Sequence, residues 1–295
     1  MTTSNDFLHR FQLERAGARG ALVRLDETWQ RVHANDEHST PLADLLGKTL
    51  AASALLMSPI KFAGRLSIHL RDSGPLRLLF ADCTHDGELR GIVRWEGAQP
   101  KEPIQLAPSA RLAITIENAV TDTRYQGLVP VEGADLAQAF EGYFERSEQL
   151  STRIVLARNG DRCGGLMVQQ IAGDGGAAIG DVDGWNRVCH LLATLMPTEL
   201  LELPPQQILL RLFHEEGIRL QAAQPLAFGC TCSRERVEDM LRALGRGEND
   251  ALLSEQGSIQ VNCEFCNRRY VFDAHDIAAV FAVRPNDKPT IVTLH

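Results

Sequence analysis

The sequence lacks the hydrophobic segments that take a chain into or across a membrane. Its first ten residues contain no apolar stretch of the kind found in secretory signals. The most apolar run, Leu50–Ile60, lies between Lys48 and Lys61 and is too short to span a bilayer. We therefore expect a cytoplasmic protein, in which cysteines stay reduced by default and clustered cysteines indicate metal binding or redox sensing.

The sequence also lacks an excess of positive charge. The 295-residue chain has a formal net charge of −8, which argues against a broad surface for nucleic acid. The region from Cys230 to His295 has eight Lys and Arg residues against ten Asp and Glu residues, a balance of −2. Four thiolates around one Zn²⁺ would add about two more negative charges. A zinc-finger protein that binds nucleic acid is therefore a disfavoured alternative.

The motifs of common enzyme classes are missing as well. There is no Gly-x-Ser-x-Gly sequence, and the nine histidines form no pair at ligand spacing. The Gly-Lys-Thr at 47–49 resembles the end of a phosphate-binding loop, but Leu42 stands where that loop needs glycine. Asp181 and Asp183 resemble the start of a calcium loop, but Leu192 stands where its last glutamate belongs. We predict no catalytic residues.

Four of the seven cysteines, in contrast, form two close pairs near the end of the chain. They are Cys230 and Cys232, one residue apart, and Cys263 and Cys266, two residues apart. Four thiolates are the complement of a closed tetrahedral zinc site. Two cysteines one residue apart can also close a small disulfide ring, which bends the backbone away from the shape that binds zinc. The four sulfurs therefore have two exclusive states: all on one Zn²⁺ ion, or paired locally as Cys230–Cys232 and Cys263–Cys266.

The spacing alone leaves open whether the zinc is purely structural or part of a redox switch. Thiolates at a zinc site are already deprotonated, and thiolate character governs oxidation. Four arginines flank the pairs and would favour the anionic sulfurs further: Arg234, Arg236, Arg268 and Arg269. An alternative of another class is a thiol–disulfide oxidoreductase that uses Cys263 and Cys266, which would need a strand before the motif and a helix after it.

The other three cysteines are isolated in the sequence. We expect Cys83, Cys163 and Cys189 to be small buried or half-buried hydrophobic residues.

The pattern of apolar residues predicts an α+β fold. Alternating residues predict strands at 21–25, 65–71, 76–80, 89–95, 112–116 and 152–157. Helices are predicted at 42–57 and 133–149. The helix at 42–57 is apolar nearly all round in its second half, so we expect it to be buried, between two sheets.

A glycine-rich stretch at 173–184 indicates a boundary. We predict an amino-terminal domain at 1–178, a helical linker at 179–229 and a zinc-binding domain at 230–295. Helical patterns at 185–196 and 206–215 are too apolar for a solvated linker and too short to form a core. They must pack on the first domain, on the zinc-binding domain, or on both.

Several motifs together resemble one known family. They are Phe228-Gly-Cys-Thr-Cys-Ser-Arg-Glu-Arg236, Val261-Asn-Cys-Glu-Phe-Cys-Asn267, Tyr143-Phe-Glu-Arg-Ser-Glu-Gln149, Gly164-Gly-Leu-Met-Val-Gln169 and Leu45-Leu-Gly-Lys-Thr-Leu50. From about Phe7 to Phe281 the chain resembles the redox-regulated heat-shock holdase chaperones of bacterial cytoplasm, the 33 kDa chaperonins. The resemblance also explains the apparent phosphate loop.

The resemblance implies an ATP-independent holdase that binds unfolding proteins during oxidative stress. The reduced form, with one zinc per chain, would be inactive, and oxidation of the four cysteines to two disulfides would release zinc and activate it. Active members of the family are dimers. The family fold has sheets around buried helices in the amino-terminal domain, a metastable helical linker and a small zinc domain. The resemblance favours the redox switch over a purely structural zinc.

Overall fold

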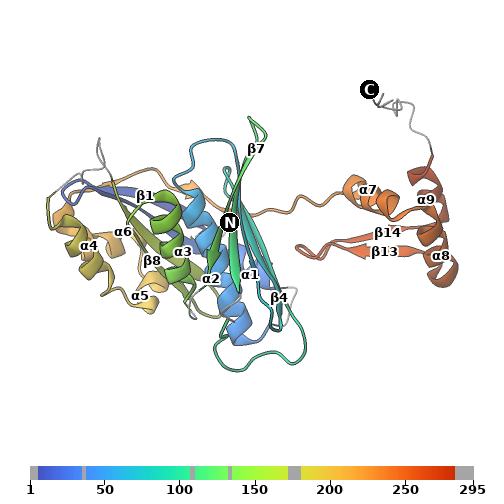
Figure 1. Cartoon of the computed structure of the whole chain (residues 1–295), viewed down its shortest axis with the longest axis horizontal. Helices are drawn as coiled ribbons and strands as arrows, with labels where there is room; N and C mark the ends of the chain where they lie inside the picture. Colours follow the sequence, from blue (N-terminus) through green and yellow to red (C-terminus); the bar gives the residue numbers. More distant parts are fainter. Residues whose placement is uncertain (1–5, 35–37, 107–109, 132–134, 172–180, 283–295) are drawn as a thin grey trace. The chain divides into compact units, whose positions relative to one another are not determined.

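The computed structural model describes residues 6–34, 38–106, 110–131, 135–171 and 181–282. The chain divides into two compact units, Met1–Cys230 and Thr231–His295. Figure 1 labels many of their helices and strands. Most of the glycine-rich stretch that was predicted as a boundary lies outside the described residues.

Two six-stranded sheets form the body of the first unit. The first sheet has the order β10-β1-β2-β9-β8, with β11 also paired to β1, and the second has the order β12-β5-β4-β3-β6-β7. The strands of the first sheet are β1 (Phe7–Leu13), β2 (Ala18–Leu25), β8 (Thr152–Arg158), β9 (Cys163–Gln170), β10 (Ile218–Leu220) and β11 (Gln224–Pro225). Those of the second are β3 (Gly64–Arg71), β4 (Leu76–Thr84), β5 (Glu88–Trp95), β6 (Arg111–Asn118), β7 (Thr123–Pro130) and β12 (Ala227–Phe228).

Helix α2 (Thr40–Met57) lies between the two sheets, as the sequence predicts. It packs on β2, β8 and β9 of the first sheet and on β3, β4 and β5 of the second. Its apolar residues from Leu42 to Met57 are buried. A helix that is apolar nearly all round can be covered only by neighbours on both sides, which is the position α2 occupies.

One further prediction about helices needs adjustment, and one helix was not predicted. The helix predicted at 133–149 is α3 (Leu136–Tyr143) followed by a π-helical turn, Phe144–Glu148, and it ends where Gln149 takes a left-handed conformation with φ of 54°. A short helix that was not predicted, α1 (Glu27–His33), follows β2.

The helical segment, residues 184–216, forms three helices where two were predicted. They are α4 (Gly184–Leu192), α5 (Pro197–Glu202) and α6 (Pro205–Phe213), and a 3₁₀ turn follows at His214–Glu216. Pro197 begins α5, because proline is well suited to the first turn of a helix.

The helical segment packs on the first sheet, on the face opposite α2. Strand residues alternate between the two faces, so Val23 belongs to the core around α2 while Leu22 belongs to a second core with the helices. This second core includes Phe11, Leu13, Leu22, Leu166 and Val168 from strands, and Leu192, Leu195, Leu200, Leu212 and Phe213 from the helical segment. The excess of leucine in the helical segment is therefore explained by its contact with the first sheet.

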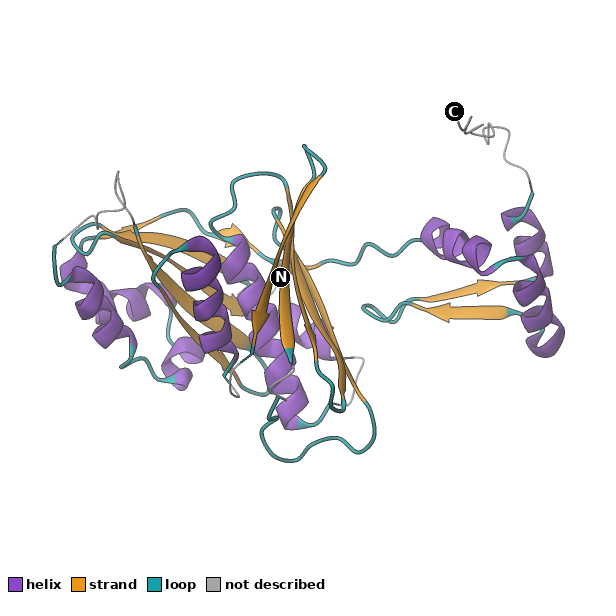
Figure 2. Ribbon diagram, viewed as in Figure 1, coloured by secondary structure: helices purple, strands orange, loops and turns teal. Residues whose placement is uncertain are grey.

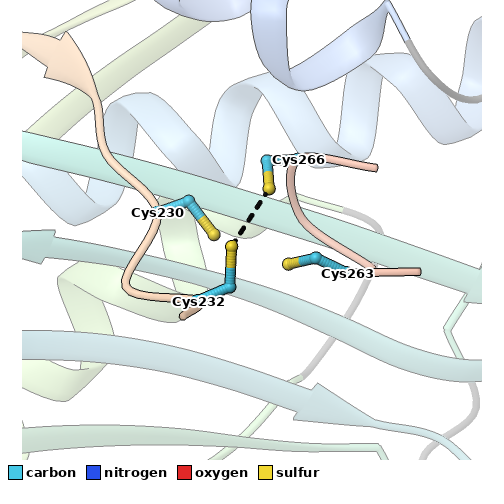
Figure 3. A group of neighbouring side chains, drawn as sticks. All are labelled: Cys230, Cys232, Cys263 and Cys266. Atoms are coloured by element: carbon cyan, nitrogen blue, oxygen red, sulfur yellow. Dashed lines mark hydrogen bonds between the residues drawn. The ribbon is translucent and has the colours of Figure 1, made fainter. Parts of the chain in front are cut away.

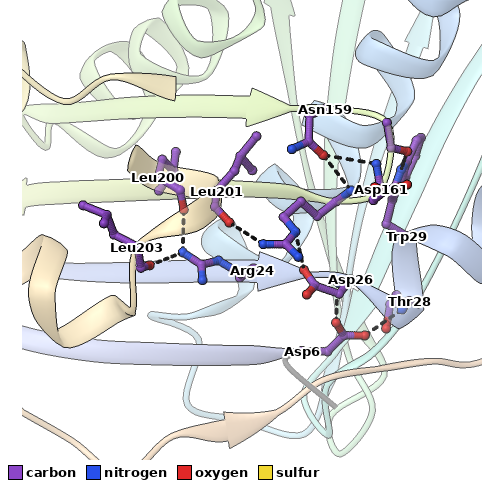
Figure 4. A network of polar contacts seen from close by, with 12 residues as sticks. Asp6, Arg24, Asp26, Thr28, Trp29, Asn159, Asp161, Leu200, Leu201 and Leu203 are labelled. Atoms are coloured by element: carbon purple, nitrogen blue, oxygen red, sulfur yellow. Dashed lines mark hydrogen bonds and ion pairs between the residues drawn. The ribbon is translucent and has the colours of Figure 1, made fainter. Parts of the chain in front are cut away.

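Polar contacts add to this packing at the end of α5 (Figure 4). Arg24 of β2 donates hydrogen bonds to the backbone carbonyls of Leu200 and Leu203. Arg162 donates to the carbonyl of Leu201 at 3.0 Å and forms an ion pair with Asp26 at 3.5 Å. The last carbonyls of a helix have no partner within it, so these two arginines satisfy acceptors that would otherwise need water.

The connecting segment, residues 217–229, is hydrogen-bonded to both sheets of the first unit. Strands β10 and β11 pair with β1, and β12 pairs in parallel with β5. The amide of Gly229, the residue before Cys230, donates a hydrogen bond to the carbonyl of Leu89. Gly87 takes a φ of 88° here, and a Cβ on it would lie 2.6 Å from the carbonyl oxygen of Pro225.

The second unit is a small α+β structure (Figure 2). It contains α7 (Arg234–Leu244), α8 (Arg246–Gln256), the hairpin β13 (Ile259–Asn262) and β14 (Arg269–Phe272), and α9 (Ala274–Val280). Its buried core consists of Leu241, Ile259, Tyr270, Phe272 and Ile277. So small a core contributes little stability by itself, which is the usual situation of a domain that depends on a metal or disulfides. The α+β fold with sheets around a buried helix, predicted from the sequence, is confirmed.

Candidate metal centre

Cys263 and Cys266 are positioned by the turn that joins β13 to β14. The amide of Cys263 donates to the carbonyl of Arg268 at 2.9 Å, and the amide of Asn267 donates to the carbonyl of Cys263 at 2.8 Å. Asn267 has a φ of 56°, a left-handed conformation that asparagine tolerates better than most residues. These bonds close a tight turn that places both cysteines at the end of the hairpin.

Cys230 and Cys232 lie between the last strand of the first unit and the first helix of the second. Cys230 follows β12 and Gly229, and Cys232 precedes Ser233, which caps α7 by accepting a hydrogen bond from the amide of Arg236. The guanidinium of Arg236 in turn donates to the hydroxyl of Thr231 at 2.9 Å. The helix cap and this bond together fix the backbone between the two cysteines.

The four cysteine side chains point toward one another (Figure 3). Their Sγ atoms all lie within 4.8 Å of one another, and each residue is half-buried. The Sγ atoms of Cys232 and Cys266 lie 3.3 Å apart. A tetrahedral zinc with bonds of about 2.3 Å needs sulfurs about 3.8 Å apart, so the group fits a four-thiolate metal ion. The pairing of the two motifs around one centre agrees with the sequence analysis.

One neighbour of the cluster was not predicted. The hydroxyl of Tyr270 donates a hydrogen bond to the Sγ of Cys232 at 3.2 Å. Tyr270 shares the buried face of β14 with Phe272, and this alternation was the only sequence signal that could have placed it near the cysteines.

The arginines that flank the cysteines have different roles. A hydrogen bond with Tyr270 raises the pKa of Arg268, and the charges of Cys232 and Cys266 add to the effect. Arg234 instead pairs with Asp276 at 2.8 Å and with Glu238 at 3.4 Å. The positive charge of Arg268 therefore acts on the sulfurs of Cys232 and Cys266.

The isolated cysteines are buried or half-buried, as predicted. Burial raises the pKa of Cys83 to about 12, and it also raises the pKa values of Cys163 and Cys189. These thiols stay protonated at neutral pH and are weak nucleophiles.

The Gly-Lys-Thr sequence at 47–49 has a structural explanation inside α2. A Cβ on Gly47 would lie 3.0 Å from the side chain of Arg158 and 3.3 Å from that of Trp29. The hydroxyl of Thr49 donates to the carbonyl of Leu45, one helical turn earlier. The glycine permits close packing and the threonine is satisfied within the helix, so neither forms a phosphate site.

Comparison with known proteins places the chain in a family. A family model described as "Hsp33 protein" matches residues 6–273. The chain belongs to the Hsp33 family. Two relatives named "33 kDa chaperonin" are similar over nearly their whole lengths. The one from Nitrosococcus oceani is 42% identical over 279 residues, covering 94% of this chain and 95% of the relative. The one from Ectopseudomonas mendocina is 42% identical over 291 residues, covering 97% and 98%.

A solved structure of this family has the same fold. The crystal structure of the 33 kDa chaperonin from Thermotoga maritima matches with a TM-score of 0.77 at 21% identity, covering 94% of this chain and 98% of that chain. In the part of the chain that is described, none of the helices combines the length and the apolar character needed to span a bilayer. The chain is thus an Hsp33-family chaperone with a four-cysteine cluster that could hold a metal ion.

Proposed function

We propose that this protein is a redox-regulated, ATP-independent holdase that binds unfolding proteins during oxidative stress. The observation that carries the proposal is the gathering of Cys230, Cys232, Cys263 and Cys266, whose sulfur atoms lie within 4.8 Å of one another. In the reduced, inactive state these four residues bind one Zn²⁺ ion. In the active state they form two disulfides, and the metal is lost.

The bound metal would supply most of the stability of the second unit. Structural zinc contributes an apparent free energy of about 10–16 kcal/mol in small peptides. A typical domain has a total free energy of unfolding of about 5–15 kcal/mol. Because the second unit has only a small buried core, loss of the metal should unfold it. The division proposed for the chain remains an amino-terminal domain at 1–178, a helical linker at 179–229 and a zinc-binding domain at 230–295.

The oxidation step needs a two-electron oxidant such as a peroxide. One thiolate of a pair attacks a peroxide oxygen, which gives a sulfenic acid and releases hydroxide. The neighbouring thiolate then attacks the sulfenic sulfur, forms the S–S bond and displaces a second hydroxide. Two thiolates lose two electrons, one peroxide is reduced, and two protons from solvent convert the hydroxides to water. Two such reactions oxidise all four cysteines.

We propose the local pairs Cys230–Cys232 and Cys263–Cys266 as the products. Short loops close at the least entropic cost, and the partners in each pair are neighbours in sequence. The contact of Cys232 with Cys266 makes a cross-linked product the main competitor.

Unfolding of the second unit would then change the first through the connecting segment. Cys230 follows directly on β12 and Gly229, which are attached to β5 by few hydrogen bonds. Release of this segment, and of the helical segment before it, would expose the apolar residues that now cover the first sheet. Exposed apolar surface of this kind binds other unfolded chains.

Other features of the proposal rest on the family resemblance. We propose that the active form is a homodimer, that the protein acts in the cytoplasm, and that it binds clients without catalysing a reaction. Nucleic acid is not a proposed partner, in line with the net charge of −8.

The decisive experiment measures zinc content and suppression of client aggregation in the same samples, before and after peroxide at raised temperature. We expect one zinc per reduced chain with little activity, and activity that appears as zinc leaves. Activity that is independent of zinc release would contradict the switch.

Turnover of a disulfide substrate would favour an oxidoreductase. An oxidoreductase needs a helix directly after its two cysteines, whereas Cys263 and Cys266 lie in the turn between β13 and β14.

A further inference from the structure

The side chain of Tyr270 joins the core of the second unit to one particular sulfur. Tyr270 lies on β14 opposite Val261 of β13, and it is only 8% exposed. Its ring packs in the core with Leu241 and Phe272, so the position of the hydroxyl is set by packing. That hydroxyl lies 3.2 Å from the Sγ of Cys232. The contact joins residues that are 38 positions apart in the sequence.

The chemistry fixes the direction of this hydrogen bond. A metal-bound cysteine is a thiolate, which can only accept, and the phenol is the donor. The phenol of tyrosine is protonated at neutral pH, so the hydroxyl of Tyr270 can donate to Cys232. The positive charge of Arg268 acts on Tyr270, Cys232 and Cys266. The hydroxyl of Tyr270 and the charge of Arg268 thus both act on the sulfur of Cys232.

A hydrogen-bond donor and a nearby positive charge have a clear effect on a four-thiolate centre. Four thiolates and one Zn²⁺ have a net charge of about −2, which hydrogen-bond donors stabilise. A donor also draws electron density from the sulfur and lowers its nucleophilicity toward peroxide. Outer-shell partners of this kind change metal affinity by about 10–100-fold in other proteins.

We propose that Tyr270 is a positioning residue of the metal centre, whose hydroxyl strengthens zinc retention at Cys232 and slows oxidation of that sulfur. The inference rests on the proposed function, because it requires that zinc binds at these cysteines. It adds a determinant of the oxidation threshold that lies outside the four cysteines.

The test uses the full-length, reduced, zinc-loaded protein and the variant Tyr270→Phe, which keeps the ring and deletes only the hydroxyl. Zinc affinity is measured by chelator competition, and zinc release is followed after addition of hydrogen peroxide. We expect affinity to fall by about 10–100-fold and release to become several-fold faster. The matched control is Tyr143→Phe, which deletes a hydroxyl bonded to Glu148 in the first unit and should change neither quantity.

A spectroscopic measurement separates this role from simple packing. With Co²⁺ in place of zinc, loss of a donor to a thiolate should move the sulfur-to-metal charge-transfer band to longer wavelength in Tyr270→Phe. An unchanged band, together with affinity and release within twofold of the unsubstituted protein, would overturn the inference.

A second variant covers the case in which Tyr270→Phe does not fold. Arg268→Gln keeps the tyrosine and removes the charge behind it, and we expect a smaller change in the same direction. If Tyr270→Phe fails to fold and Arg268→Gln matches the unsubstituted protein in affinity and release, the inference is wrong.

If the unsubstituted protein binds no zinc, the proposed function fails and the inference falls with it. If it binds zinc and releases it to peroxide while the variants behave identically, only the inference fails.

Discussion

At the scale of single residues, the cysteines of this chain fall into two chemically distinct sets. Cys230, Cys232, Cys263 and Cys266 are half-buried and share one centre. Cys83 and Cys163 are buried, and burial raises the pKa values of both thiols. Reactivity therefore follows position in the fold more than residue type.

The first prediction concerns Cys263, a proposed ligand of the metal ion. Cys263→Ser should lose zinc or bind it far more weakly, because a neutral hydroxyl replaces one of four thiolates. The loss should exceed the roughly 10–100-fold effect expected for an outer-shell partner. Metal analysis after dialysis measures it, with Cys189→Ser as the control. Full zinc retention in Cys263→Ser would remove this residue from the proposed site.

The second prediction concerns which thiols react. After peroxide treatment, peptide mapping should find Cys230–Cys232 and Cys263–Cys266, with the other cysteines still reduced. Burial raises the pKa of Cys83 to about 12, so its thiolate is scarce at neutral pH. Alkylation of Cys83 in the folded protein should accelerate only as the pH rises toward that value or when the protein unfolds. Mainly cross-linked products, such as Cys232–Cys266, would contradict the proposed pairing.

At this scale the sequence predicted which cysteines lie together, and it did not predict their neighbours. Cysteine spacing predicted all four members of the cluster, because each pair is local. Tyr270 was missed because its hydroxyl meets Cys232 only after the hairpin and α7 have packed. Contacts between residues distant in sequence leave no local pattern.

At the scale of elements, the helical segment is covered on one side and open on the other. Leu195 is 6% exposed and belongs to the core over the first sheet, whereas Leu210 on α6 is 58% exposed. The two leucines differ in burial within the same segment, so they form a matched pair for testing the role of docking.

The third prediction uses this pair. Leu195→Ala should weaken the docking of the helical segment by about 2–5 kcal/mol, the usual cost of such a truncation in a core. It should then suppress client aggregation with less oxidation, or none, and the segment should exchange amide hydrogens faster. Leu210→Ala should behave like the unsubstituted protein. If Leu195→Ala stays inactive until it is fully oxidised, exposure of this segment is not the switch.

The strands differ in how well they can be predicted from their sequences. Alternating residues predicted β3 and β5, and in β3 successive residues alternate between buried and partly exposed positions. Strand β9 was missed because it is buried on both faces and contains Gly164 and Gly165, so no alternation is visible. Strands β10, β11 and β12 have two or three residues each, and only pairing with distant strands defines them.

At the scale of the whole molecule, the two units differ in what stabilises them. The first has large cores on both faces of its first sheet, and the second has a small one. Stability should therefore depend on metal in the second unit and on hydrophobic burial in the first.

The fourth prediction follows from this difference. Removal of zinc from the reduced protein by a strong chelator should unfold the second unit and leave α2 protected. Hydrogen exchange by mass spectrometry should show fast exchange in α7 and α9, with unchanged protection between Leu42 and Met57. Protein that is already oxidised should show no further change with chelator. Retained protection of α9 after complete zinc removal would show that the second unit is stable without metal.

The pairing of β1 with β10 also has a consequence for folding during synthesis. Phe11 lies opposite Leu220, so one edge of β1 has no partner until the ribosome has passed the end of the helical segment. At a synthesis rate of about 5–20 residues per second, that edge stays unpaired for roughly 10–40 s. The apolar face with Phe11 and Leu13 stays exposed for a similar time, since the helical segment that covers it is also synthesised late. The nascent chain therefore passes through a period in which a protein that protects others needs protection itself.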